Sequence, residues 1–190
     1  MKKDLGSLPG VFPMPVLMVA TYGEDGKIDV MNVAWGNICG MDKIALNLAP
    51  ERKTLKNIRA KKAFTVALAD AAHVKEADFL GTASGNTMAD KFERTGLHAV
   101  KSSRIDAPII EEFPVTLECE VAEIRDSFGE VKVTGTIINV IADEKVLDEN
   151  GKINAGKLNA IMFDQFQNSY YIVGSQLAQA WSVGGELMKK

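Results

Sequence analysis

The spacing of apolar residues changes twice between residues 27 and 70, and this change limits the possible folds more than any other feature of the sequence. Residues 29–35 and 43–48 are rich in the apolar residues of strands, and the glycines, asparagine and aspartate between them predict a sharp hairpin. Residues 51–62 show the apolar spacing of a short helix, and residues 63–70 the nearly charge-free pattern of a buried strand. The stretch is therefore predicted to place a helix between strands.

A candidate anion site lies at the start of the predicted helix. Arg52, Lys53 and Thr54 stand at or just before its N-terminus, where unpaired backbone N–H groups and the positive end of the helix dipole favour an anion. Two cations and a hydroxyl suit a phosphate group. Asn57 follows in the same helix, where its amide can hydrogen-bond either a ligand or the helix backbone, and both roles stay open.

The rest of the chain also has mainly the pattern of β-structure. Residues 115–124 alternate apolar and polar side chains, and a β-branched run at 131–142 follows a turn signal, so the two are expected to form a meander that closes a barrel. Glu118, in the first of these strands, is expected to face outward. The other expected elements are strands at 16–22 and 170–173 and helices at 73–80 and 88–95, ended by Gly81 and Gly96.

Length and composition indicate an ordinary globular domain. The chain has 190 residues, of which 46% are apolar and 25% charged, and no repeat or flexible linker marks a boundary. We therefore predict one domain over residues 1–190, with a frayed tail at Lys189-Lys190. A net charge of -3 argues against nucleic acid as the main partner, because binding to a phosphate backbone requires a basic face.

The sequence offers no signal for a membrane or a metal. It contains no run of about eighteen apolar residues, and prolines between residues 9 and 15 interrupt the apolar start before the core of a signal peptide could form. Two cysteines without CxxC spacing fit a reducing compartment, so we expect a cytoplasmic protein. The two histidines lie far apart without a second ligand at zinc spacing, and we predict no metal site.

The order and spacing of two motifs resemble a known family. NVAW at residues 32–35 and ERKTLKNI at residues 51–58 are similar to the flavin reductase-like family of FMN-binding split barrels and, within it, to the flavoredoxins. The resemblance covers nearly the whole chain. It implies a mainly β fold with a few helices, a split β-barrel, FMN as cofactor with FAD as a second possibility, and a homodimer with the flavin near the interface.

The resemblance also assigns residues to the cofactor. Small residues between Asn32 and Asn37 would let the backbone approach the flavin ring, beside Trp35, for which an ordinary core position is the alternative. Lys91 would contact the phosphate or the ring, its alternative being a solvated surface lysine, and Phe163 would pack near the flavin or simply be buried. The candidate cofactor-binding residues are Asn32, Ala34, Trp35, Asn37, Arg52, Lys53, Thr54, Asn57, Lys91 and Phe163.

Three positions depart from the pattern of the family. Asn32 stands where many relatives have a hydroxyl residue, although its amide can still donate to and accept from the polar edge of a flavin. The loop at residues 42–44 reads Asp-Lys-Ile where relatives commonly have Asp-Pro-Pro. Glu130 stands where relatives often carry a histidine that meets the flavin, so that contact is either lost or chemically different.

These features lead to one expected activity and two alternatives. The chain has no GxGxxG or Walker motif, so NAD(P)H is expected only as a transient reductant of bound flavin, with no side chain assigned a catalytic role. The expected function is thus a flavin reductase-like oxidoreductase. A flavoredoxin-type electron carrier, with tightly bound FMN and a redox protein as partner, is the first alternative, and a flavin-free barrel is the second.

Overall fold

The structure is a computed structural model that describes residues 1–189. The strands are β1 (Met14–Pro15), β2 (Leu17–Tyr22), β3 (Ile28–Val33), β4 (Gly36–Gly40), β5 (Lys43–Leu48), β6 (Ala63–Leu68), β7 (Ala99–Lys101), β8 (Pro108–Ile110), β9 (Val115–Ser127), β10 (Glu130–Ala142), β11 (Ile161–Asp164) and β12 (Ser169–Ile172). The α-helices are α1 (Lys53–Lys61), α2 (Val74–Thr82) and α3 (Ala155–Leu158), and 3-10 helices span Ala71–His73, Glu93–Thr95, Glu144–Val146 and Gly185–Lys189. The predicted mainly β fold with a few helices is confirmed.

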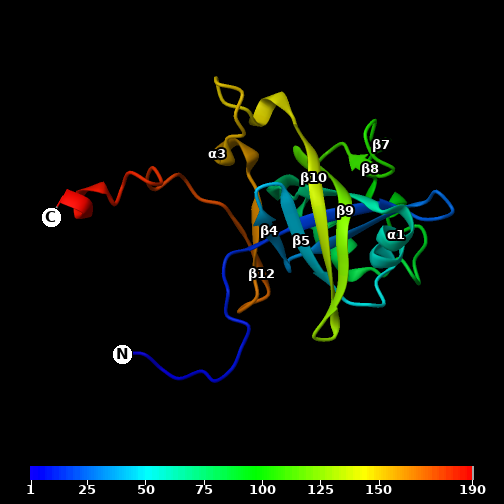
Figure 1. Ribbon diagram of the computed structural model, residues 1–190, viewed down its shortest axis with the longest axis horizontal. Helices are drawn as coiled ribbons and strands as arrows, with labels where there is room; N and C mark the ends of the chain where they lie inside the picture. The colour runs from blue at the N-terminus through cyan, green and yellow to red at the C-terminus, as the bar shows by residue number, and fades with distance from the viewer. Residues whose placement is uncertain (190) are drawn as a thin grey trace.

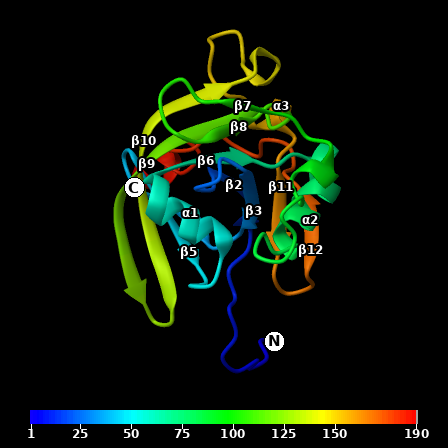
Figure 2. The same ribbon diagram turned by 90° about the vertical axis from the view of Figure 1, so that its right-hand side faces the viewer.

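Seven strands form one curled antiparallel sheet in the order β3-β2-β6-β9-β10-β5-β4 (Figures 1 and 2). Only Ala34 and Trp35 separate β3 at one edge from β4 at the other. Because a chain spans at most about 3.6 Å per residue, these two edges lie close together. The sheet therefore curls into a half-barrel, and α1 lies in its opening (Figure 2).

Strand β2, next to the edge strand β3, contributes side chains to two separate cores. Its side chains alternate between faces, with Leu17 and Val19 in the core that also contains Leu55 and Ile58 of α1. Met18 and Ala20 point the other way, into a second core. Within this second core lie buried residues of α2 and β11, so residues 17–20 of β2 are all apolar instead of every second one.

Two smaller sheets complete the fold. Strands β1, β11 and β12 form a three-stranded antiparallel sheet in the order β1-β11-β12, and β7 pairs with β8 in a short hairpin. The β11–β12 hairpin stands beside α2, away from β9 and β10 (Figure 2). Within residues 1–189, no helix is long and apolar enough to cross a membrane.

The predicted hairpin between residues 29–35 and 43–48 is wrong. The intervening residues form a strand of their own, β4, which pairs with β5, whereas β3 lies at the opposite edge of the sheet. Gly36 is suited to this place because a Cβ there would lie 2.7 Å from the side chain of Leu46 and 2.8 Å from that of Leu17. The glycine therefore supports close strand packing, where we had expected turn chemistry.

Three further predictions about local structure are corrected. Residues 88–95 form turns and the 3-10 helix Glu93–Thr95 instead of an α-helix, because Lys91 is drawn into the interior of the protein. Gly81 lies inside α2, which continues to Thr82. Glu118 is buried rather than outward-facing, and its carboxylate accepts hydrogen bonds from Ser102 and Asn139. The expected frayed tail ends at Lys190, outside the described residues.

Candidate functional site

A cavity of about 500 Å³ opens between the main sheet, α2 and the β11–β12 hairpin. Its wall is formed by the end of β3 and the residues after it, by β5 and the loop that leads to α1, by one side of α2, and by single residues of β10, β11 and β12. The volume lies in the range of about 300–1,000 Å³ that is usual for small-molecule sites. Five candidate residues line it, namely Asn32, Ala34, Trp35, Arg52 and Phe163.

Asn32 is held in place by close packing between β3 and α2. Its Nδ2 atom donates a hydrogen bond to the backbone oxygen of Ala77 at 3.3 Å. A Cβ at Gly81 would lie 3.0 Å from the Cβ of Asn32, so this glycine allows the helix to approach the strand. The amide of Asn32 therefore has a defined orientation at the wall of the cavity.

The apolar part of the cavity is lined by aromatic side chains from two distant segments. Trp35 follows β3 and is 49% exposed, which excludes the ordinary core position that we had kept as its alternative. Its backbone oxygen accepts a hydrogen bond from the backbone N–H of Asn47 at 2.8 Å. Phe163 on β11 lies opposite Tyr170 on β12 in the strand register, with ring centroids 5.9 Å apart. A planar ligand would find aromatic surface on both.

The anion end of the site is the N-terminus of α1. Arg52 is the N-cap residue, makes no side-chain cap hydrogen bond, and precedes a first turn without acidic residues. Arg52, Lys53, Thr54 and Lys91 line one small pocket together with Ser84 and Gly85. Because Arg52 also lines the large cavity, the two spaces adjoin. The structure thus brings the three predicted phosphate residues together with Lys91, which was expected to contact either the phosphate or the ring.

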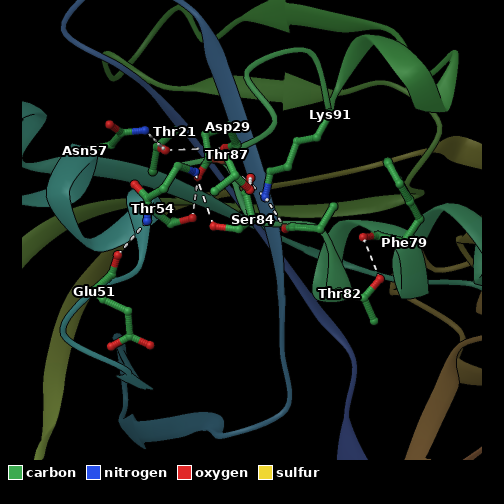
Figure 3. Close-up of polar contacts among 12 residues, drawn as sticks. Thr21, Asp29, Glu51, Thr54, Asn57, Phe79, Thr82, Ser84, Thr87 and Lys91 are labelled. Atoms are coloured by element: carbon green, nitrogen blue, oxygen red, sulfur yellow. Dashed lines mark hydrogen bonds and ion pairs between the residues drawn. The ribbon is translucent and has the colours of Figure 1, made fainter.

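A buried polar network, to which Asp29 belongs, forms part of the wall of this pocket (Figure 3). The hydroxyl of Thr54 donates to Asp29 Oδ2, and Lys91 Nζ lies 3.2 Å from Asp29 Oδ1 and 3.4 Å from the backbone oxygen of Ala83. Lys91 is 3% exposed, so the surface-lysine alternative is excluded. A Cβ at Gly85 would overlap Asp29 Oδ1, so the loop that carries Gly85 can press against the network only with glycine there.

Two candidate residues lie apart from both spaces. Asn57 is buried in α1 and donates a hydrogen bond to the hydroxyl of Thr21 at 3.0 Å, which fits a role in supporting the helix. Asn37 lies on the edge strand β4, where its side chain accepts from the N–H of Ile38. It lines a neighbouring groove of about 410 Å³ that shares Ala34 and Trp35 with the main cavity.

The cavity also contains residues that sequence reasoning missed. Asp78 on α2 accepts a hydrogen bond from the Tyr170 hydroxyl at 2.9 Å, and both residues line the cavity. Burial, together with the neighbouring Asp78, raises the pKa of Tyr170 to about 12. Ser84, which lines the anion pocket, was not among the candidate residues. The sequence could have pointed to Asp78 only through its three-residue spacing from Gly81, which places both on one face of α2. The contact with Tyr170 has no local signal, because the two residues are 92 positions apart.

Comparisons with known proteins agree with this arrangement. Flavoredoxin of Desulfovibrio vulgaris (Miyazaki F) superposes with a TM-score of 0.92 at 33% sequence identity, covering 97% of this chain and 100% of that chain. A putative flavin reductase with split barrel domain from Shewanella frigidimarina, at 20% identity, superposes with a TM-score of 0.78 over 87% of this chain and 84% of that chain. The second match shows the fold, and the predicted split barrel is confirmed.

Sequence comparison leads to the same group. A protein of Aeropyrum pernix is 30% identical over 132 residues, which make up 65% of this chain and 50% of that protein, so the match spans half of the relative's length. The family pattern described as "Flavin reductase like domain" matches residues 9–160, which include the half-barrel and most of the cavity wall. The chain therefore belongs to the flavin reductase-like family, as NVAW and ERKTLKNI had indicated.

Proposed function

We propose that this protein binds FMN in the cavity and acts as a flavin reductase-like oxidoreductase. The main support for the proposal is that a pocket lined by cations at the N-terminus of α1 adjoins a larger cavity lined by aromatic residues. A flavin needs an anchor for its phosphate, a slot for its ring and hydrogen bonds to its polar edge. Membership in the flavin reductase-like family supports the choice of flavin over other anionic ligands.

Each part of the site would hold one part of the cofactor. Arg52, Lys53 and the helix N-terminus would bind the phosphate through charge-assisted hydrogen bonds. Trp35 and Phe163 would border the ring. Asn32 would bind its polar edge, with the small Ala34 beside it. Thr54 and Lys91 line the same pocket as Arg52 and Lys53, and each also contacts Asp29. They would therefore bind the phosphate while Asp29 fixes the position of their side chains.

The bound flavin would supply two-electron transfer, and the protein would supply geometry. NAD(P)H would act as a transient reductant that reaches the ring through the open side of the cavity, which Trp35, 49% exposed, borders. Such a reaction requires alignment of donor and acceptor more than a side-chain acid or base. FAD remains a second possible cofactor, and a cytoplasmic location remains an expectation from the sequence.

A flavoredoxin-type electron carrier is the second candidate. The observation that favours it is the similarity to flavoredoxin at 33% identity over nearly the whole chain. Several cations around the phosphate would hold FMN tightly, as a carrier requires. In this case electrons would arrive from a redox protein and leave to another one, without turnover of NAD(P)H.

Absorption spectroscopy of the purified protein under anaerobic conditions separates these possibilities. FMN is added, unbound flavin is removed, and NADH or NADPH is then mixed in. Rapid bleaching of the flavin band supports the reductase. Bleaching only by dithionite or a protein donor supports the carrier, and failure to retain or titrate FMN would refute the proposed function as a whole.

A homodimer is also proposed, because both terminal segments present apolar side chains to solvent. Residues 1–13 and 173–188 extend away from the body of the molecule (Figure 1). Leu177 and Trp181 are 99% and 100% exposed, and such a gathering of exposed apolar side chains on one segment is typical of an interaction surface. A second copy of the chain would bury them.

Light scattering after size-exclusion chromatography tests the dimer. The expected mass is twice that of one chain. A double Leu177→Ser, Trp181→Ser variant should shift toward the monomer. Phe128→Ser, which changes an equally exposed residue at the tip of the β9–β10 hairpin, should leave the mass unchanged. A monomeric wild-type protein would contradict the proposal.

A further inference from the structure

Asp78 is a charged residue of the cavity wall that the proposed binding of FMN does not use. It lies on α2 beside Gly81 and Thr82, which line the same wall. The other ionisable groups that line the cavity are Arg52 at the anion end, Glu130 at the start of β10, and Tyr170. Apart from the anion end, the fixed charge of the wall is therefore negative.

The Asp78 carboxylate is oriented by a contact across the cavity. Tyr170 lies on β12, in register with Phe163 on β11, and its hydroxyl donates to Asp78 Oδ1 at 2.9 Å. Because burial and Asp78 hold the pKa of this phenol at about 12, Tyr170 stays a hydrogen-bond donor throughout the physiological pH range. The contact joins α2 to the β11–β12 hairpin and keeps one carboxylate oxygen in a defined place.

The negative charge of Asp78 is not neutralised by a cation of the protein. Among the residues that the structure describes, no Lys, Arg or His lies within ion-pairing distance of Asp78 or of Glu130. The cation of the cavity wall is Arg52, which lies at the anion end. Its charge would be neutralised by the phosphate of the cofactor and not by Asp78. An occupant that fills this cavity therefore lies beside an uncompensated carboxylate.

Reduction of a flavin changes the charge of the ring. Two electrons and one proton convert the neutral oxidised ring into an anion whose charge develops near N1. A fixed carboxylate beside the ring disfavours the added negative charge. Asp78 is itself exposed to solvent, so the effect has the size expected for charges near a protein surface, where the effective dielectric constant is still well below that of water. The oxidised form is then bound more tightly than the reduced form.

From this arrangement we infer that Asp78, held by Tyr170, lowers the reduction potential of a flavin bound in the cavity. The inference rests on the proposed function, since it needs a flavin in this site. It assigns Asp78 to tuning the cofactor rather than to binding it. A protein built in this way would deliver electrons at low potential.

The test is the midpoint potential of FMN in the intact protein, measured against a reference dye during titration with dithionite. Dithionite is oxidised to sulfite and supplies the two electrons that the flavin takes up. In Asp78→Asn the amide oxygen still accepts from Tyr170, but the charge is gone. We expect the ratio of the affinities for reduced and oxidised FMN to rise about tenfold, which for a two-electron couple is about 30 mV upward.

Two control variants separate charge from structure. Glu76→Gln removes a carboxylate from the same helix α2 at a position that does not line the cavity, and it should leave the potential unchanged. Tyr170→Phe removes the hydrogen bond but keeps the charge, so its potential should stay nearer that of wild type than that of Asp78→Asn. An Asp78→Asn potential equal to or below that of wild type would overturn the inference.

A measurement on the wild-type protein keeps the inference testable if Asp78→Asn does not fold. Dissociation constants are determined for oxidised FMN in air and for reduced FMN under dithionite. Oxidised FMN should bind more tightly than reduced FMN, because the uncompensated charges of the wall are the carboxylates of Asp78 and Glu130. Equal affinities would reject the inference while leaving the proposed function intact, whereas no binding of either form would reject the proposed function.

Discussion

Lys91 and Asp29 form a buried ion pair in the wall of the anion pocket. The Nζ and Oδ1 atoms lie 3.2 Å apart, and the two side chains are 4% and 6% exposed. The second carboxylate oxygen of Asp29 accepts from Thr54, the second residue of α1. Asp29 therefore connects Lys91 to the N-terminus of α1, where a phosphate would bind. Loss of either charge should lower both the stability of the protein and its affinity for FMN.

Replacing Lys91 by Met should destabilise the protein by about 3–5 kcal/mol, because Asp29 would remain charged in a buried place without its partner. Urea denaturation measures the change. Adding Asp29→Asn to Lys91→Met should recover part of the loss, since the unpaired charge is then removed. Arg94→Gln breaks an exposed pair with Asp90 and should cost less than about 1 kcal/mol. Equal losses for Lys91→Met and Arg94→Gln would contradict the structural role.

Replacing Arg52 and Lys53 together by Ala should weaken FMN binding at least about tenfold, because charge-assisted hydrogen bonds to the phosphate are lost. Riboflavin, which has no phosphate, should bind with little change. Fluorescence titration measures both affinities. Lys56→Ala, an exposed position of the same helix, serves as the control and should preserve FMN binding. A parallel loss of FMN and riboflavin affinity would move the phosphate away from Arg52 and Lys53.

Replacing Trp35 by Leu should change the visible spectrum of bound flavin while the free energy of unfolding changes by less than about 1 kcal/mol. The side chain is 49% exposed, so its loss opens no buried cavity. Absorption spectra and urea denaturation are compared between the two proteins. If the flavin spectrum were identical to that of the wild type, Trp35 would not border the ring.

The two thiols should differ in reactivity. Burial, and secondly the neighbouring Glu118, raise the pKa of Cys119 to about 12, whereas Cys39 is exposed on β4. A thiolate-specific reagent at pH 8 should label one cysteine per native chain and two per chain in denaturant. Mass spectrometry of the labelled peptides identifies them. Rapid native labelling of Cys119 would show that its strand opens readily.

The same thiol should contribute to alkaline instability. Its folded pKa of about 12 lies above the ordinary thiol pKa of 9.0, so the unfolded chain loses the thiol proton first as the pH rises. The contribution of Cys119 to stability is therefore complete below pH 9 and is lost as the pH rises toward 12. In Cys119→Ala, urea denaturation should show a smaller drop in stability across this range than in the wild type.

Local periodicity and helix-end chemistry determined the central part of the fold. The strand predicted at 43–48 matches β5, and the strand predicted at 63–70 contains β6. Both signals are contained in a few consecutive residues, because alternation of faces and helix spacing are properties of neighbours in the chain. The phosphate residues Arg52 and Lys53 could be proposed for the same reason, since a helix N-terminus is a local feature.

Tertiary structure decided the features that depend on residues far apart in the sequence. Asp78 and Tyr170 are separated by 92 residues and meet only because the β11–β12 hairpin packs beside α2. Lys91 left its expected helix because Asp29 offers a buried partner, and Glu118 turned inward because Ser102 and Asn139 satisfy it. For Lys91 and Glu118 the free energy of pairing a buried polar group outweighed the local preference of the chain, and only the folded structure determines which partners are available.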